Sequence, residues 1–169
     1  MIYLLLVIAI FFADYFIKDY IEEHKKQGTD EKILNGKIIV TKYHNSGVFL
    51  NFLENRKETV VTISGVLFGM ILMFFVILLP QKRKRLLKFA VACLVGGAAN
   101  NLYDRIKRGY VVDYFSFSYL KKVIFNISDL FIFFGSFLIM IISSIYQRLN
   151  FSTYQPFNYS CTTSLKPLP

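Results

Sequence analysis

The stretch Val60–Leu79, VVTISGVLFGMILMFFVILL, decides the fold of this chain. It contains no charged residue and is followed directly by Pro80. A helix rises about 1.5 Å per residue, so a segment of this length matches the roughly 30 Å hydrocarbon core of a bilayer. The segment therefore predicts a membrane-spanning helix, and the rest of the chain is interpreted outward from it.

Three further apolar blocks accompany this segment: Ile2–Ala13, which resumes after Asp14 at Tyr15–Ile17, then Leu86–Leu102, and Leu130–Tyr146. Each reaches spanning length together with its flanks, so the simplest fold is an α-helical integral membrane protein with four transmembrane helices. We expect the first block to be retained and not cleaved as a signal peptide. No basic residue precedes it, and no small-x-small cleavage site follows it.

The composition supports a membrane protein. Of the 169 residues, 54% are hydrophobic and 18% are charged, and 18 are Phe. Disordered chains are poor in such residues, so that class is excluded. The chain has two cysteines, Cys93 in an apolar block and Cys161 near the C-terminus, which excludes a disulfide scaffold. We expect Cys93 to behave as a small buried hydrophobe.

The distribution of basic residues predicts the orientation. The formal net charge is +9, and the basic residues lie between the apolar blocks, so anionic lipid headgroups, and not nucleic acid, are the expected partner. Lys82–Arg85 and Lys88 form the shortest and densest basic connection, which predicts a cytoplasmic loop. Both termini would then be cytoplasmic, and residues 19–59 and 103–128 would face outward.

The first outward segment is predicted to contain a β-hairpin. Asn35-Gly36 lies between the β-prone runs Lys32–Leu34 and Ile38–Thr41, and both turn residues tolerate positive φ. The C-terminal end of the chain is polar and aperiodic. We therefore expect a membrane domain over residues 1–148, with a small outer hairpin or cradle, and a disordered cytoplasmic tail over residues 149–169.

Asp113 and Asp129 are the main candidates for chemistry. Both fall at the outer membrane boundary in this topology. Two carboxylates that lie close together share a proton, which supplies an acid and a base at one pH and can activate water. A structural interpretation stays open, in which Asp129 caps the last helix and Asp113 is a solvated loop residue.

Other polar groups adjoin the apolar blocks. Gly96–Arg105 combines small residues, which permit close helix packing, with Asn101 and Arg105, which can hold a peptide or a carboxylate. Asp14 and Lys18 share one helix face and are compatible with an ordinary surface pair. Asn45 fits either a ligand site or a turn. The two histidines are too isolated to predict a metal site.

These pieces, taken in order, resemble the lipoprotein signal peptidase family, bacterial signal peptidase II, over about residues 1–147. The matching pieces are Asp14…Lys18, Asn45-x-Gly47, Gly96-Gly97-Ala98-x-x-Asn101-x-x-Asp104-Arg105, Gly109-x-Val111-x-Asp113 and Phe125-Asn126-x-x-Asp129. The run from Gly96 to Asp129 is the most specific part. Asp14 and Lys18 alone would carry little weight.

The resemblance implies a membrane aspartyl endopeptidase that removes the signal peptide of prolipoproteins just before a diacylglyceryl-modified cysteine. Asp113 and Asp129 match its catalytic dyad, and it requires no cofactor and no metal. Its implied location is the bacterial cytoplasmic membrane, with the active site at the outer face, and the cyclic peptide globomycin is its implied inhibitor. The implied supporting residues are Asn101 and Arg105 on the substrate backbone, Asn126 on the dyad, Asn45 at the outer site, and Asp14, Lys18 and Asp104 as structural support.

The chain also departs from the family pattern. Asn100 stands where the family usually has Gly, Ser128 replaces Ala before the second aspartate, and Tyr114 replaces Phe after the first. Val48-Phe49-Leu50 resembles a shortened form of a family motif. None of these changes removes a group that the resemblance assigns to catalysis.

Two other classes of function remain open from the sequence. The first is a small membrane binding or transport protein, whose polar pathway would be lined by Asp113, Asp129, Asn101 and Arg105. No internal repeat supports a transporter. The second is a structural membrane partner. Substrate preference and oligomeric state do not follow from the sequence.

Overall fold

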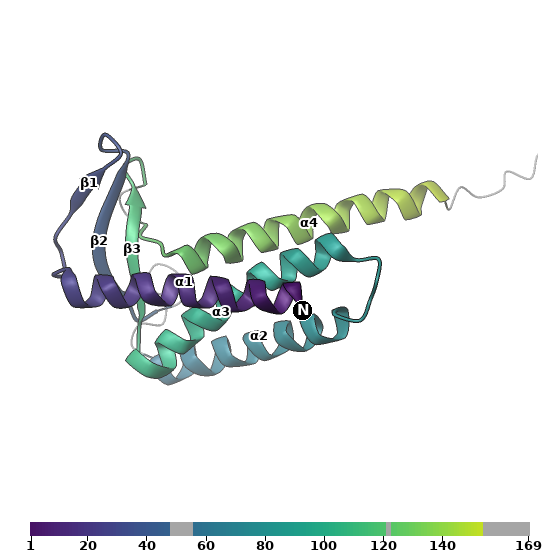
Figure 1. The fold of residues 1–169 in the computed structure, drawn as a ribbon, viewed down its shortest axis with the longest axis horizontal. Coiled ribbons are helices and arrows are strands. Elements are labelled where there is room, and N and C mark those ends of the chain that lie inside the picture. The colour runs from purple at the N-terminus through teal and green to yellow at the C-terminus, as the bar shows by residue number, and fades with distance from the viewer. Residues whose placement is uncertain (48–55, 121–122, 154–169) are drawn as a thin grey trace, which may run out of the picture.

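The structure is a computed structural model that describes residues 1–47, 56–120 and 123–153. Its elements in chain order are α1 (Ile2–His24), β1 (Glu31–Ile33), β2 (Ile38–Asn45), α2 (Lys57–Leu78), α3 (Arg85–Arg108), β3 (Val111–Phe117) and α4 (Ile127–Thr153). The helices run roughly side by side, and the sheet stands at the end of the helices far from the N-terminus and the α2–α3 connection (Figure 1).

Within the described part of the chain, three helices are long and apolar enough to cross a membrane: Lys57–Leu78, Arg85–Arg108 and Ile127–Arg148. They coincide with three of the predicted blocks. The apolar stretches of α2 and α4 are only 11% buried inside the protein. Their outward faces are lined by Leu, Ile, Phe and Met side chains, which suits a hydrocarbon solvent.

The helix α1 is continuous across Asp14, where the sequence showed an interruption of the apolar block. It is not among the three spanning candidates, because Asp14, Lys18 and Asp19 all lie within its length. Its buried residues are Ile10, Asp14, Lys18 and Ile21, and their spacing of three and four places them on one face. Two of the charges of α1 therefore face the protein interior.

The helix α3 lies at the centre and packs against the other three helices. Its small residues permit this packing, which confirms that part of the Gly96–Arg105 prediction. A Cβ at Gly96 would lie 2.9 Å from Cβ of Ile10 on α1, and one at Gly97 would collide with the carbonyl oxygen of Ser128 on α4. Cys93 is fully buried on α3, as predicted.

The sheet has the order β1-β2-β3 and is antiparallel throughout. The predicted hairpin is confirmed, with Ile33 paired to Ile38 and positive φ at Leu34, Asn35 and Gly36. The third strand was not predicted. β3 comes from the second outward segment and pairs with β2, so that Asp113 stands opposite Tyr43.

Two predictions concern segments that lie partly or wholly outside the described residues. The helix α4 continues to Thr153, past residue 148, where the membrane domain was expected to end. The remaining residues of the expected tail, 154–169, and the Val48-Phe49-Leu50 motif lie outside the described part of the chain.

Candidate active site

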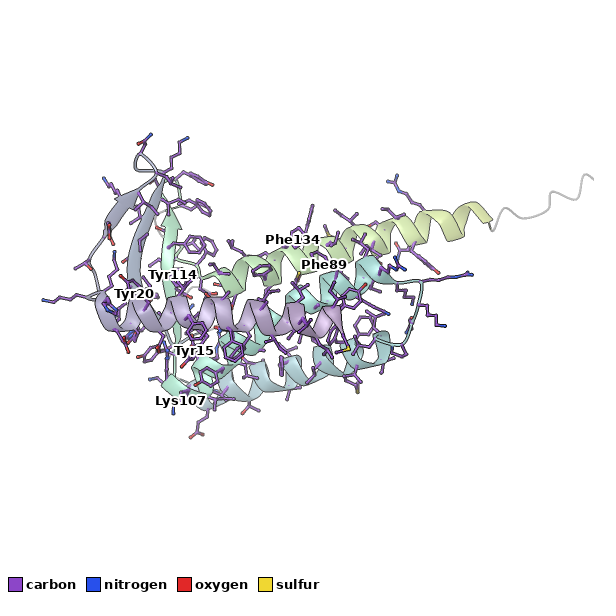
Figure 2. The ribbon with its side chains drawn as sticks, in the orientation of Figure 1. Tyr15, Tyr20, Phe89, Lys107, Tyr114 and Phe134 are labelled. Atoms are coloured by element: carbon purple, nitrogen blue, oxygen red, sulfur yellow. The ribbon has the colours of Figure 1, made fainter. Side chains whose placement is uncertain are left out.

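The residues singled out in the sequence converge where the sheet meets the helices. They come from five elements and the short segment before α4: Asp14 and Lys18 on α1, Asn45 on β2, Asn101, Asp104 and Arg105 on α3, Asp113 on β3, Asn126 just before α4, and Asp129 on its first turn. Side-chain hydrogen bonds and ion pairs join all of these except Arg105 into one network, and Arg105 is connected to it through the backbone carbonyl of Asn101. Tyr114, the neighbour of Asp113, marks this junction at the base of the sheet (Figure 2).

Asp113 is a buried strand residue with a relative exposure of 2%. Its Oδ2 accepts a hydrogen bond from Nδ2 of Asn45 at 3.0 Å, and its Oδ1 accepts one from Nδ2 of Asn126 at 2.6 Å. The interpretation of Asp113 as a solvated loop residue is therefore wrong. Asn45, which the sequence linked to a ligand or a turn, orients this carboxyl and also accepts the N–H of Gly47 at 3.2 Å.

Asp129 occupies the first turn of α4 but is not its N-cap. The N-cap of α4 is Asn126, because its Oδ1 accepts the N–H of Asp129 at 2.9 Å. In return, Oδ2 of Asp129 accepts the N–H of Asn126 at 3.3 Å. This reciprocal pair is a capping box. The other oxygen of Asp129 accepts Nδ2 of Asn101 at 2.8 Å, which ties the carboxyl to α3.

Asn126 links the two carboxyl groups. Its fully buried amide donates to Asp113 and accepts from the backbone of Asp129. An amide has a donor end and an acceptor end, so one side chain holds both partners in a fixed relation. This arrangement requires that β3, which carries Asp113, pairs with β2, and that Asp129 lies in the first turn of α4.

Electrostatics favour one proton on this pair near neutral pH. Burial, and then the negative charge of Asp129, raise the pKa of Asp113 from its usual 3.8 to about 7. The hydrogen bonds from Asn45 and Asn126 and the charge of Lys18 act in the opposite direction on this pKa, but they do not cancel the rise.

Lys18 is fully buried, so its interpretation as part of a surface pair is wrong. Its Nζ lies 3.2 Å from Oδ2 of Asp14 and 3.0 Å from Oδ2 of Asp104. It also donates to Oδ1 of Asn100 at 2.6 Å and Oδ1 of Asn101 at 2.8 Å. Since an uncompensated buried ammonium is very costly, this shell is what allows Lys18 to stay inside.

Two of these contacts lead onward to the rest of the site. Asn101 connects Lys18 with Asp129. Its Oδ1 accepts a hydrogen bond from Lys18, and its Nδ2 donates one to Asp129. Asp104 accepts the backbone N–H of Val112 at 3.3 Å and so anchors the start of β3 beside α3. The support roles implied for Asp14, Lys18 and Asp104 agree with these contacts.

Arg105 lies beside the pair and reaches carbonyl groups. Its terminal nitrogens donate to the oxygens of Asn101 at 3.5 Å and Gly47 at 3.4 Å. Its buried Nε has no hydrogen-bond partner within the described residues. Arg105 therefore retains a free donor, and it connects α3 with the segment that follows β2.

Among residues 1–47, 56–120 and 123–153, no group of three or more His, Cys, Asp or Glu side chains is placed to hold a metal ion. His44 bonds to Glu22 at 3.0 Å and stacks on Tyr110. It fastens the sheet to the end of α1.

Three site residues were noticed in the sequence only as departures from a family pattern. They are Asn100, Tyr114 and Ser128, and all are buried with hydrogen bonds to α1. Polar residues at apolar positions of a helix or strand were the available signal.

A helical membrane protein with a buried, hydrogen-bonded carboxylate pair at one end of its helices has the features of a membrane-embedded aspartic hydrolase. A family model described as signal peptidase (SPase) II matches residues 6–145. The chain belongs to that family.

Curated relatives agree with this assignment. A lipoprotein signal peptidase of Lactiplantibacillus plantarum is 31% identical over 128 residues, covering 76% of this chain and 84% of the relative. A lipoprotein signal peptidase of Clostridioides difficile is 27% identical over 138 residues, covering 80% of this chain and 90% of the relative. Similarity to solved structures extends to the fold. A bacterial membrane enzyme determined in meso at 2.3 Å superposes with a TM-score of 0.75 at 22% identity, over 91% of this chain and 92% of that one.

Proposed function

We propose that this chain is the endopeptidase that cleaves prolipoproteins immediately before the diacylglyceryl-modified cysteine, with Asp113 and Asp129 as its catalytic pair. The observation that carries the assignment of the pair is the single amide of Asn126 that bonds to both residues. Family membership supports the substrate class.

The chemistry follows from the unequal surroundings of the two carboxyl groups. Asp113, whose pKa is raised to about 7, carries the shared proton and donates it to the scissile carbonyl. Asp129 accepts hydrogen bonds from the Asn101 amide and the backbone N–H of Asn126, and in this proposal its carboxylate takes a proton from the attacking water. A proton then passes to the leaving amine, so the pair is regenerated after the peptide bond breaks.

Arg105 and Asn101 supply contacts for the substrate backbone in this proposal. The free Nε of Arg105 suits a substrate carbonyl, because a guanidinium nitrogen only donates hydrogen bonds. Asn45 belongs to the outer part of the site, where a cyclic peptide such as globomycin would compete with the substrate. Membrane lipid surrounds the apolar faces, and the acyl chains of the substrate lie against them.

The proposed placement has four membrane-spanning helices in the bacterial cytoplasmic membrane, α1 included. Asp14 and Lys18 do not oppose a spanning α1, because both are fully buried and face α3 and α4 instead of lipid. Lys82–Arg85 lies at the end far from the sheet, so the positive-inside rule puts that end in the cytoplasm and the carboxylate pair at the outer face.

A transport function has less support than a peptidase. Asp14, Lys18, Asn101 and Asp104 bond to one another within the described residues and form a closed network. A transport path would need such groups to face an aqueous route.

The test is cleavage of a synthetic diacylglyceryl prolipoprotein peptide by the purified full chain. Asp113→Asn and Asp129→Asn should each lower cleavage by at least about a thousandfold, since an amide cannot exchange a proton with water. Asp30→Asn, at an exposed position before β1, is the matched control and should cleave normally. Near-normal cleavage by Asp129→Asn would reduce Asp129 to a capping-box partner of Asn126, because the side-chain oxygen of Asn can still accept the N–H of Asn126.

A further inference from the structure

Each carboxylate of the proposed pair has a chain neighbour that hydrogen-bonds to the same third carboxylate, that of Asp14. Tyr114 follows Asp113, and its hydroxyl donates to Oδ1 of Asp14 at 2.8 Å. Ser128 precedes Asp129; its N–H donates to Oδ2 of Asp14 at 3.1 Å, and its hydroxyl donates to the same oxygen. Asp14 on α1 therefore holds β3 and α4 together.

A further bond closes this arrangement. The hydroxyl oxygen of Tyr114 accepts the N–H of Ile127, the first residue of α4, at 3.1 Å. Asp14 and Ser128 are fully buried and Tyr114 is nearly so, so water does not compete for these bonds. Adjacent strand residues point to opposite faces of a sheet, so Tyr114 lies behind the face that presents Asp113.

We propose that Asp14 is a positioning residue that sets the separation of the two reacting carboxylates, by clamping Tyr114 and Ser128. This inference rests on the proposed function and deepens it. Lys18 lies 3.2 Å from the Asp14 carboxyl, so the clamp does not leave an uncompensated charge in the interior.

The clamp and its surroundings contain the three polar residues that the sequence analysis noted as departures from the family pattern. The hydroxyls of Tyr114 and Ser128 each add a side-chain hydrogen bond to Asp14, and Phe and Ala at these two places could not make either bond. Asn100, the third departure, accepts from Lys18 at 2.6 Å and donates to the carbonyl oxygen of Phe11 on α1 at 2.8 Å. All three departures serve one buried network around Asp14 and Lys18.

Removal of a clamp hydroxyl should therefore change the chemical step more than substrate binding. A displacement of about 1 Å at a reacting group can cost up to a hundredfold in rate. The shared-proton equilibrium of the pair also depends on its separation. The charged and titratable groups that face the carboxylate pair are Asp14 and Lys18 from α1, Asp104 and Arg105 from α3, and Tyr114 from β3.

The experiment uses the full chain in lipid nanodiscs with a diacylglyceryl prolipoprotein peptide as substrate. The variants are Tyr114→Phe, Ser128→Ala and the double variant, which retain the rings and the backbone. The matched controls are Tyr119→Phe, at a largely exposed position beyond β3, and Ser144→Ala, whose exposed hydroxyl bonds only to the carbonyl of Met140 within α4 among the described residues.

We expect kcat to fall about tenfold in each clamp variant with KM nearly unchanged, while the controls keep the kcat of the wild type. The two limbs of the pH–rate profile should move closer together, since a looser pair couples its protons more weakly. The double variant should lose less than the product of the single losses, because both hydroxyls act through Asp14. A lower melting temperature with unchanged kcat and unchanged pH limbs would overturn the clamp.

The clamp and the proposed function can fail separately. If the wild type cleaves the peptide and the clamp variants match it in kcat and pH profile, only the clamp is wrong. If the wild type does not cleave, the proposed function is wrong. Infrared titration of the protonated carboxyl band then still tests the clamp without substrate: a shift of the titration in Tyr114→Phe and Ser128→Ala supports it, and an unshifted titration overturns it.

Discussion

The position of Asp129 is compatible with both of the roles that the sequence presented as alternatives, a capping residue and the proposed catalytic carboxylate. Asp129 is a capping-box partner of Asn126, and its second oxygen is bound by Asn101 from another helix. A charged carboxylate can accept the N–H of the cap and can also act as a base, and the helix dipole favours negative charge at this helix N-terminus. The two roles therefore reinforce each other, and only proton exchange separates them experimentally.

Asp113 should lower the stability of the folded protein at neutral pH. Its pKa is raised to about 7 when folded, from 3.8, so the unfolded chain ionises it more readily. A raised carboxyl pKa means that the stability contributed by the neutral form is present below about pH 4 and is lost as pH rises through about 7.

Asp113→Asn should accordingly stabilise the protein above neutral pH. One pKa unit corresponds to about 1.4 kcal/mol, but Asn places an NH₂ group near the donors Asn45 and Asn126. We expect a net gain of about 1–2 kcal/mol at pH 8 that disappears near pH 4. Thermal unfolding in detergent at both pH values measures it, and a loss of stability at pH 8 would contradict the assigned charge balance.

At the level of the elements, the contact between α3 and α4 aligns the site. Gly97 faces the backbone of Ser128, one residue before Asp129, and Asn101 lies one helical turn further along α3. The same close approach therefore allows the Asn101 amide to reach the Asp129 carboxylate. The sequence suggested helix packing or substrate binding for Gly96–Arg105. The glycines at its start are suited to packing, and Asn101 and Arg105 near its end are suited to binding.

Gly97→Ala should push the two helices apart. The new Cβ would collide with backbone, which cannot move aside as a flexible side chain can. We expect a loss of about 1–3 kcal/mol in stability and a large loss of cleavage. The matched control is Gly69→Ala on α2, where nothing lies within 4 Å, and it should be neutral or slightly stabilising. Equal behaviour of the two variants in thermal unfolding and cleavage would contradict this account of the packing.

For the whole molecule, charge is distributed unevenly along the helix axes. The connection between α2 and α3 holds Lys82, Arg83 and Lys84, next to Arg85, and no acidic residue occurs between Glu58 and Asp104. The described acidic residues come from the segments around the sheet. Such a distribution favours insertion with the α2–α3 connection in the cytoplasm.

Single-cysteine labelling tests this orientation. In a Cys161→Ser background, where Cys93 is buried, Lys37→Cys should react with an impermeant thiol reagent in intact cells, and Lys84→Cys should react only after lysis. Both positions are exposed in the protein, so access to the thiol depends on the membrane alone. Labelling of the Lys84→Cys site in intact cells would reverse the topology.

The sequence by itself determined the helices and the hairpin, because both depend on neighbours along the chain. Apolar length predicted α2, α3 and α4, and Asn35-Gly36 predicted the turn between β1 and β2. The resemblance also singled out Asp113 and Asp129. These features need no knowledge of distant contacts.

The tertiary structure alone decided what surrounds those residues. The strand β3 forms because Val111–Phe117 pairs with β2, although α2 and α3 separate the two strands along the chain. No local sequence pattern encodes that pairing. In isolation, Asp14 and Lys18 fit a surface pair; their burial becomes affordable only when Asp104, Asn100 and Asn101 reach Lys18 from α3. The physical reason is that a buried charge needs several partners at once, and a helix can bring such partners only from other parts of the chain.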